Sequence, residues 1–232
     1  MQPLRHTHGC ARDGAWAIGR LLQRSTLPTQ RRSHQAVNVQ QAWQNGWFEN
    51  AKHLPSPNVG PRPPGTKLRL VVLHSISLPP GEFSNGCIEQ LFTNTLDWDT
   101  HPYFQQIRGT EVSSHFVIAR SGELTQFVSI HERAWHAGQS SWCGTNNCND
   151  FSIGIELEGL EGGSFEPYQY NTLSALSAAL LKVLPDIEGF AGHEHIAPGR
   201  KRDPGSGFEW QRLAVLLGAD ANQLSWPIPI QK

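Results

Sequence analysis

Two histidines and a carboxylate stand at places in the sequence where their side chains could meet around a metal ion. His193 and Asp203 lie ten residues apart in one loop, GHEHIAPGRKRDPG, and His74 ends a strand-like apolar run far upstream. Zinc accepts imidazole nitrogen and carboxylate oxygen, and three protein ligands leave its fourth position open for water. The three residues therefore predict a catalytic metal site, with metal-assisted hydrolysis as the first hypothesis.

The identity of one ligand stays open at this point. His193 and His195 would point to the same side of an extended segment and could act as a pair. Taken singly, each residue has a plainer explanation: a histidine often ends a strand with its hydrogen bonds satisfied, and Asp203 precedes a proline and could simply turn the chain. The set carries more weight, because α/β sheets build their sites at strand ends and in the loops that follow.

A metal hydrolase also needs a base for the attacking water, and two carboxylates are candidates. Glu156 and Glu158 share one face of an otherwise apolar run, which is costly unless they are solvated, paired or functional. An exposed strand face explains Glu158 equally well, whereas Glu156 lies deeper in the run and is the predicted base. Lys201 could stabilise a developing oxyanion, or could be a solvated lysine between Arg200 and Arg202.

Composition narrows the class of protein. The chain has 232 residues, enough for one domain plus an appendage, and its 19 Lys+Arg nearly balance its 20 Asp+Glu. This balance argues against a nucleic-acid or membrane-surface partner. No apolar run approaches the roughly 20 residues of a membrane span, and the N-terminal stretch AWAIGRLL is too interrupted for a signal peptide. We therefore predict a cytoplasmic protein.

The cysteines agree with that compartment. The four residues Cys10, Cys87, Cys143 and Cys148 match no zinc-binding spacing and are too few for a secreted disulfide framework. We expect free thiols in a reducing compartment. A local disulfide between Cys143 and Cys148 is the alternative.

The chain divides into three segments. Residues 1–40 are polar, lack helical or strand periodicity and are predicted to be a disordered extension. Residues 41–220 form the predicted domain, in which residues 46–65 are a surface arm whose prolines exclude regular structure over 55–65. Residues 221–232 are a predicted C-terminal tail.

Within the domain, apolar periodicity predicts strands and helices in alternation. Strands are expected over 68–77 and 151–159 and on both sides of Ser121–Gly122, with a short helix after Cys87. Two longer helices follow. One is capped at Asn171 or Thr172 and stopped by Pro185; the other runs from a capping box, Ser206 to Glu209, to Gly218 and buries Trp210, Leu213 and Leu217. This order indicates the α/β class, with a central mixed β-sheet flanked by helices.

Six strings of the sequence resemble the AmpD-type N-acetylmuramoyl-L-alanine amidases, whose fold is shared with peptidoglycan recognition proteins and phage lysozyme-amidases. The strings are VVLHSISLPPGEF, HPYF, SSHFVIA, RAWHAG, CNDFSIGIELEG and GHEHIAPGRKRDPG. They keep the family's order and spacing between about residue 46 and about residue 217. Six separate motifs make chance agreement improbable.

The resemblance implies a role for each candidate residue. It places the family's zinc ligands on His74, His193 and Asp203, its catalytic glutamate on Glu156 and its oxyanion-stabilising lysine on Lys201. The metal site would thus hold Zn2+. The choice between the two loop histidines falls on His193.

Substrate-binding residues are also implied. Tyr103 in HPYF and Trp135 in RAWHAG match positions that line the cleft in relatives, although either could be a core aromatic. Ser75 and Ala197 are further predicted substrate contacts. His195 becomes a loop residue.

Other positions are structural or depart from the family. His115 and His136 are interpreted as structural residues or as partners of the ligands. Glu111 and Asn147 stand where relatives often carry arginines that would contact substrate carboxylates, so the preference for the stem peptide is open.

The resemblance further implies hydrolysis of the amide between the lactyl group of muramic acid and L-alanine. The substrates would be 1,6-anhydro-muropeptides released in cell-wall recycling, and the enzyme a bacterial cytoplasmic monomer whose partner is this small molecule. Two alternatives are a muropeptide receptor of the same fold without turnover and an exported amidase acting on intact cell wall. A receptor typically lacks a zinc ligand, and an exported enzyme needs an export signal.

Overall fold

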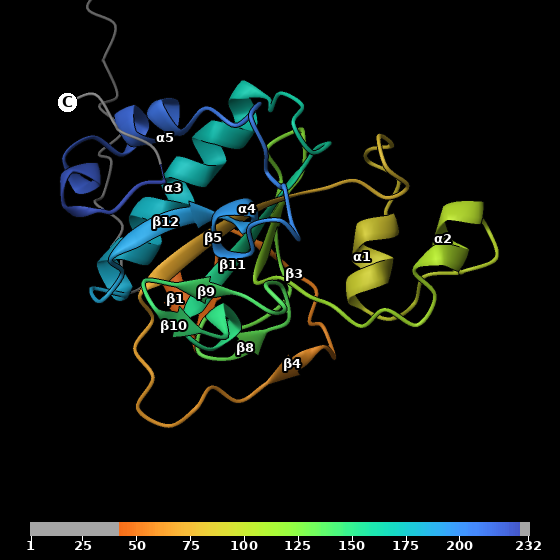
Figure 1. Cartoon of the computed structure of the whole chain (residues 1–232), viewed down its shortest axis with the longest axis horizontal. Coiled ribbons are helices and arrows are strands. Elements are labelled where there is room, and N and C mark those ends of the chain that lie inside the picture. Colours follow the sequence, from red (N-terminus) through yellow and green to blue (C-terminus); the bar gives the residue numbers. More distant parts are fainter. Residues whose placement is uncertain (1–41, 228–232) are drawn as a thin grey trace, which may run out of the picture. The chain divides into compact units, whose positions relative to one another are not determined.

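The computed structural model describes residues 42–227, and a six-stranded β-sheet organises this part of the chain (Figure 1). The predicted disordered extension over 1–40 and the last five residues of the predicted tail lie outside the described residues. The strands, in spatial order, are β12 (Gly189–Gly192), β5 (Leu70–Ile76), β11 (Ser152–Glu158), β6 (Phe116–Ile118), β7 (Leu124–Gln126) and β3 (Lys52–His53).

The sheet is mixed, as predicted. β12, β5, β11 and β6 run parallel, β7 is antiparallel to β6, and β3 is parallel to β7. The two long apolar runs form β5 and β11, which pair over seven residues at the centre of the sheet. All seven residues of β11 are buried, although only Ile153, Ile155 and Leu157 are large and apolar and they alternate with smaller or polar residues.

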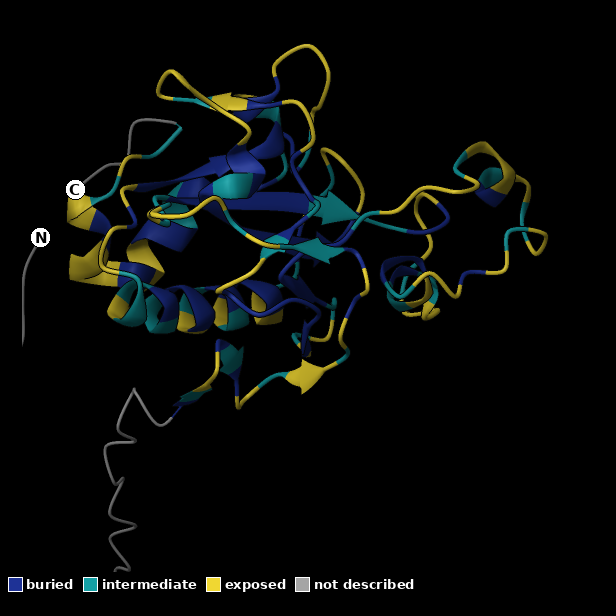
Figure 2. Ribbon diagram, turned by 90° about the horizontal axis from the view of Figure 1, so that it is seen from below, coloured by how far each residue is buried: buried dark blue, intermediate teal, exposed yellow. Residues whose placement is uncertain are grey.

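One face of the sheet packs against α3 (Pro167–Val183) and α5 (Trp210–Leu217). The side of α3 that faces the sheet is buried and its opposite side is exposed (Figure 2). Odd-numbered residues of β5 and β11, such as Leu73 and Ile155, join Leu173, Leu176 and Leu213 of these helices in one apolar cluster. This cluster is the main hydrophobic core.

Both helices begin elsewhere than predicted. α3 starts at Pro167, four residues before Asn171, because proline suits a first helical position and the Gln169 side chain accepts the Glu166 N–H at 2.9 Å. α5 starts at Trp210 and not at Ser206, after a turn closed by a hydrogen bond from Phe208 N–H to Gly205 O. The predicted burial of Trp210, Leu213 and Leu217 is confirmed.

The opposite face carries two smaller apolar clusters. One contains Val117 and Phe127 of the sheet region with α1 (Cys87–Phe92), and α2 (Pro102–Gln106) extends it through Phe104. The other contains Val72 of β5, with Ile196 of α4 (His193–Ile196). The even-numbered residues at the ends of β5 and β11 emerge between these clusters, and this position defines the functional site.

The proline-rich arm is more regular than predicted. β1 (Trp43–Gln44) and β2 (Trp47–Phe48) form a hairpin, β3 joins the main sheet, and β4 (Val59–Gly60) pairs with β8 (Arg133–Ala134). The expectation of no regular structure over 55–65 was therefore wrong for β4. Two residues between Pro57 and Pro61 are enough to pair, because neither proline has to donate to the ladder.

The remaining elements follow the sheet. β9 (Ser141–Trp142) and β10 (Thr145–Asn146) form a hairpin that precedes the 3-10 helix η2 (Cys148–Asp150), and a second 3-10 helix, η3 (Gly218–Gln223), follows α5. Cys87, Cys143 and Cys148 are free thiols, so the alternative of a local disulfide does not hold. In the predicted tail, Ser225 bridges to Gly189 and Trp226 stacks on Phe190. No helix within residues 42–227 combines the length and the apolar character needed to cross a membrane.

Arg62 anchors the arm to the domain. Its buried guanidinium donates to the backbone carbonyls of Asn149, Asp150 and Ser152 at 2.8–3.1 Å, next to the Nε2 atom of His115. Burial, and then the charge of Arg133, lower its pKa to about 10, so it remains charged at neutral pH.

We expect Arg62→Ala to lower the free energy of unfolding by about 3 kcal/mol, because it leaves several buried carbonyls without a donor. Urea denaturation followed by circular dichroism measures this. Arg108→Ala is the matched control, since its guanidinium pairs with Asp99 in solvent and should contribute less than about 1 kcal/mol. Equal losses in the two variants would show that Arg62 is not an anchor.

Candidate metal and active site

The parallel register brings the candidate residues to one edge of the sheet. Glu156 of β11 lies opposite His74 of β5, and Gly192 of β12 lies opposite Leu73, so that His193 follows beside His74. The loop after α4 then folds back, and the backbone N–H of Glu194 donates to Asp203 O at 2.9 Å. The carboxyl ends of three adjacent parallel strands thus build the site, as is usual in α/β sheets.

His74, His193 and Asp203 form the predicted cluster. The Nδ1 atom of His74 lies 3.0 Å from Nδ1 of His193 and 3.0 Å from Oδ2 of Asp203, and the remaining edge of this triangle is 3.2 Å. Zinc bonds of about 2.0–2.1 Å in a tetrahedron separate neighbouring ligand atoms by about 3.3 Å. The three ligand atoms are therefore spaced as a small divalent metal requires.

The protonation of the ligands also suits a metal. The Nε2 atom of His193 lies 3.0 Å from the carbonyl oxygen of Ala137, which can only accept, and 3.4 Å from Nη2 of Arg200, which can only donate. The shorter contact places a proton on Nε2 and leaves Nδ1 facing the cluster. The His74 ring is completely buried, and this burial lowers its pKa to about 4. Two ring nitrogens and a carboxylate oxygen held this close repel one another unless a proton or a metal ion lies between them, and a divalent cation could be bound by all three.

Glu156 stands next to the cluster in a nearly dry position. Its side chain is 8% exposed, and Oε2 has no hydrogen-bond partner among the described residues. Burial, and then the negative charge of Asp203, raise the pKa of Glu156 well above its ordinary value, while the charge of Lys201 lowers it. A carboxyl group with a raised pKa and an unpartnered oxygen is suited to exchange protons with a ligand in the cleft.

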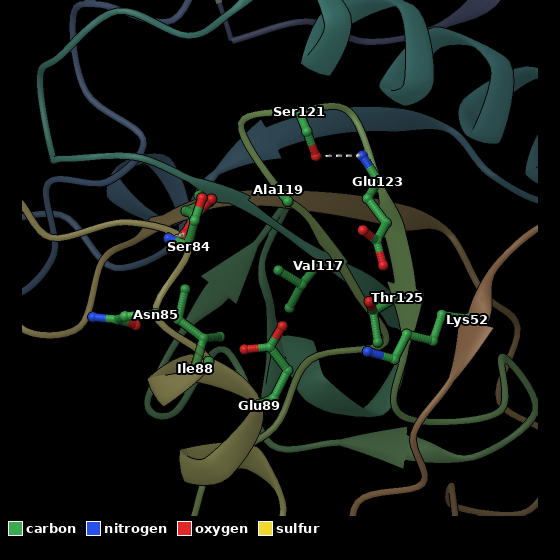
Figure 3. Close-up of a pocket in the computed structure, with 12 residues that line it drawn as sticks. Lys52, Ser84, Asn85, Ile88, Glu89, Val117, Ala119, Ser121, Glu123 and Thr125 are labelled. Atoms are coloured by element: carbon green, nitrogen blue, oxygen red, sulfur yellow. Dashed lines mark hydrogen bonds between the residues drawn. The ribbon is translucent and has the colours of Figure 1, made fainter.

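Glu158 does not share this environment. Its two carboxylate oxygens accept the backbone N–H groups of Ser84 and Arg120, so it fastens the β5–α1 loop to the sheet. It borders a separate pocket of about 280 Å³ behind α1, into which Lys52 and Glu89 point (Figure 3). Glu156 and Glu158 lie on the same face of β11 but differ in their hydrogen bonds: Glu158 accepts two backbone N–H groups, whereas Oε2 of Glu156 has no partner among the described residues.

One cleft of about 550 Å³ contains all the predicted metal and catalytic residues. His74, Glu156, His193, Lys201 and Asp203 all line it. The Lys201 side chain is exposed at its rim, where the turn of the loop is closed by the Lys201 N–H donating to Ala197 O.

The predicted substrate-binding residues are distributed over two hollows. Tyr103 and Ser75 line the cleft, and the Ser75 hydroxyl has no partner among the described residues. Ala197 lines an adjoining pocket, which shares Arg200 with the cleft. Trp135 lies outside the residues that line either hollow, with its backbone hydrogen-bonded to Ser113.

Several neighbours of the site were not predicted. Arg200 and Arg202 add positive charge to the cleft, and their only trace in the sequence is the basic run around Lys201. His195 lies apart from the cluster: its Nδ1 accepts the Gly192 N–H at 2.9 Å and caps α4.

The two positions at which the resemblance led us to expect arginine are both exposed. Glu111 lies between two cleft-lining residues, Thr110 and Val112, and Asn147 lines the adjoining pocket.

An open three-ligand centre beside a buried carboxylate is the arrangement of a mononuclear metal hydrolase. Residues 64–206 match the family described as N-acetylmuramoyl-L-alanine amidase. The chain therefore belongs to this amidase family, and its fold is the mixed sheet with flanking helices expected from the resemblance.

Individual relatives agree. The 1,6-anhydro-N-acetylmuramyl-L-alanine amidase AmpD of Escherichia coli (strain K12) is 46% identical over 178 residues, which cover 76% of this chain and 97% of that protein. AmpD of Haemophilus influenzae is 42% identical over 171 residues, or 73% and 93% of the two chains. A crystal structure of a selenomethionine derivative of AmpD has a TM-score of 0.72 at 47% identity and covers 75% of this chain and 98% of its own.

The raised pKa of Glu156 predicts a pH-dependent cost to folding. Because the folded pKa lies above the unfolded one, the stability that this group contributes at low pH is lost as pH rises above its ordinary value near 4.5. In metal-free protein, Glu156→Gln should therefore be more stable than wild type at pH 8, with the difference shrinking toward pH 4.5. Urea melts across this range measure it, and a gap that widens toward low pH would contradict it.

Proposed function

We propose that this amidase hydrolyses the amide between the lactyl group of N-acetylmuramic acid and L-alanine in 1,6-anhydro-muropeptides, in cell-wall recycling. The observation that carries the proposal is the convergence of three ligand atoms beside Glu156 in one cleft. The substrate is inferred from the relatives, several of which are named 1,6-anhydro-N-acetylmuramyl-L-alanine amidases and match almost their entire length.

The metal in this proposal is Zn2+, held by His74 Nδ1, His193 Nδ1 and an Asp203 oxygen. Two nitrogens and one oxygen with an open fourth position suit zinc. When bound, zinc supplies an activated water at neutral pH and polarises the scissile carbonyl.

The protein's own groups complete the reaction. Glu156 takes a proton from the attacking water and later delivers it to the departing amine of L-alanine, a transfer for which a carboxyl with a raised pKa is suited. The Lys201 ammonium faces the negative charge that develops on the carbonyl oxygen. The dry surroundings of Glu156 strengthen these interactions.

Substrate contacts follow from the lining of the two hollows. We assign the packing of a sugar or stem to Tyr103 and Ser75 in the cleft, and a contact to Ala197 in the adjoining pocket. Trp135 lines neither hollow, so we assign it no substrate contact. The cations Arg200 and Arg202 can receive the carboxylates of the stem peptide.

We further propose that the catalytic domain covers residues 41–220 and acts as a monomer in the cytoplasm. The free thiols of Cys87, Cys143 and Cys148 support a reducing compartment. A freely diffusing muropeptide is the partner that such an enzyme requires.

The first test combines reaction and metal. Zinc-loaded protein incubated with a 1,6-anhydro-muramoyl tripeptide should release free tripeptide and anhydro-sugar, seen by mass spectrometry, and a chelator should stop the release. Glu156→Ala should lower the rate by about 10²–10⁴-fold while retaining zinc, because it removes the base. Glu123→Gln, an exposed glutamate outside the cleft, is the control. Intact substrate despite bound zinc would favour a receptor, and full activity of Glu156→Ala would exclude Glu156 as the base.

The second test separates the two loop histidines. Zinc at about 100 times its dissociation constant should stabilise wild type by about 2.7 kcal/mol. His193→Ala should lose this stabilisation, because one ligand is gone, whereas His195→Ala should retain it. Thermal unfolding with and without zinc measures the difference, and loss of the zinc effect in His195→Ala would make His195 a ligand.

A further inference from the structure

His136 lies directly behind the metal-ligand cluster and contacts His74 on the side away from the other ligands. Its Nδ1 atom is 3.0 Å from Nε2 of His74, and the two rings meet edge to face at 84°. His193 has a different kind of support, the backbone carbonyl of Ala137. The two ligand histidines are thus held by one side-chain partner and one backbone partner.

His74 and His136 belong to a series of hydrogen bonds that continues through Ser152 to the carbonyl oxygen of Cys148, and the donor in each bond can be deduced. The carbonyl oxygen of Cys148 can only accept, so the single proton of the Ser152 hydroxyl, 2.5 Å away, points to it. Ser152 Oγ must then accept from His136 Nε2, at 3.2 Å. His136 is therefore protonated on Nε2 and bare on Nδ1, and it accepts the proton of His74 Nε2. The bare atom of His74 is consequently Nδ1, which faces the cluster.

Both rings are buried, so protein groups and not water must satisfy their ring nitrogens. A neutral imidazole has one donor and one acceptor nitrogen, so the Cys148 carbonyl at one end of the series determines which nitrogen of each ring carries the proton.

The His136 ring can approach β11 this closely because residue 154 of the strand is a glycine. A Cβ atom on Gly154 of β11 would lie 2.5 Å from Cγ of His136 and 2.7 Å from its Nδ1. Any other residue at 154 would push the ring off the strand and away from His74. The glycine is thus explained by the close approach of the imidazole.

We propose that His136, anchored by Ser152, is a positioning residue that holds His74 in the tautomer with Nδ1 bare and thereby sets the zinc affinity of the cluster. The inference rests on the proposed function in that it takes zinc as the metal. Loss of such an outer hydrogen-bond partner typically weakens metal binding about 10–100-fold.

The test compares two substitutions of His136 in the full-length protein. His136→Leu removes the acceptor but keeps apolar bulk, and it should weaken zinc binding about 10–100-fold in competition with a chromophoric chelator. His136→Asn keeps an amide oxygen near the position of Nδ1 and should recover most of the affinity. Equal zinc affinity of wild type and His136→Leu would overturn the proposal, as would equally weak binding by both variants when both are folded by circular dichroism.

A second measurement does not depend on zinc or on activity. In metal-free wild type, imidazole 15N chemical shifts should show His74 protonated on Nε2 and bare on Nδ1, and His136 likewise. Ser152→Ala removes only the hydroxyl that His136 Nε2 contacts. In this variant, His136 should show a mixture of both tautomers. A His74 protonated on Nδ1 in wild type would refute the proposed role of His136. The expected tautomer in a protein that binds no zinc would refute the proposed function alone.

Discussion

Three lone-pair atoms from distant parts of the chain are held within 3.0–3.2 Å of one another, and most of the structure around the site serves this convergence. These atoms repel unless a proton or a metal ion lies between them, so the surrounding structure has to hold them in place. The backbone does part of this: the parallel strands β5 and β12 place His74 and His193 side by side, and the loop after α4 brings Asp203 back to them.

The two faces of the sheet divide the tasks of stability and chemistry. The face under α3 and α5 is a continuous apolar cluster, which supplies most of the hydrophobic stabilisation. The other face is divided into two clusters, and the polar residues emerge between them. Because the residues of a strand alternate between faces, one strand such as β11 can place Ile155 in the core and Glu156 in the cleft.

The central strands and the identity of the cluster could be predicted from the sequence, because long apolar runs and strand-end polar residues are local features. β12 was not predicted, since Gly189–Gly192 has two glycines and too little apolar pattern to register as a strand; its place in the sheet depends on pairing with β5.

The choice between His193 and His195 also needed tertiary information. Residues two apart share a side in an extended segment, but this segment is the short helix α4, which turns His195 away to cap Gly192. Likewise, the sequence pattern places Glu156 and Glu158 on the same face of the strand. Only the N–H groups of Ser84 and Arg120, brought in from other segments, make Glu158 a structural residue.

The electrostatics of the cleft couple the metal site to the base. In the metal-free protein, burial and the charge of Asp203 raise the pKa of Glu156 and so favour its protonated form. A divalent cation among the three ligands would reverse the second of these contributions, since the net charge beside Glu156 changes sign. A bound cation would therefore lower the pKa of this carboxyl group and favour its ionised form. The metal ligands and Glu156 thus form one electrostatic unit, in which the charge at the ligand cluster influences the proton affinity of the neighbouring carboxyl group.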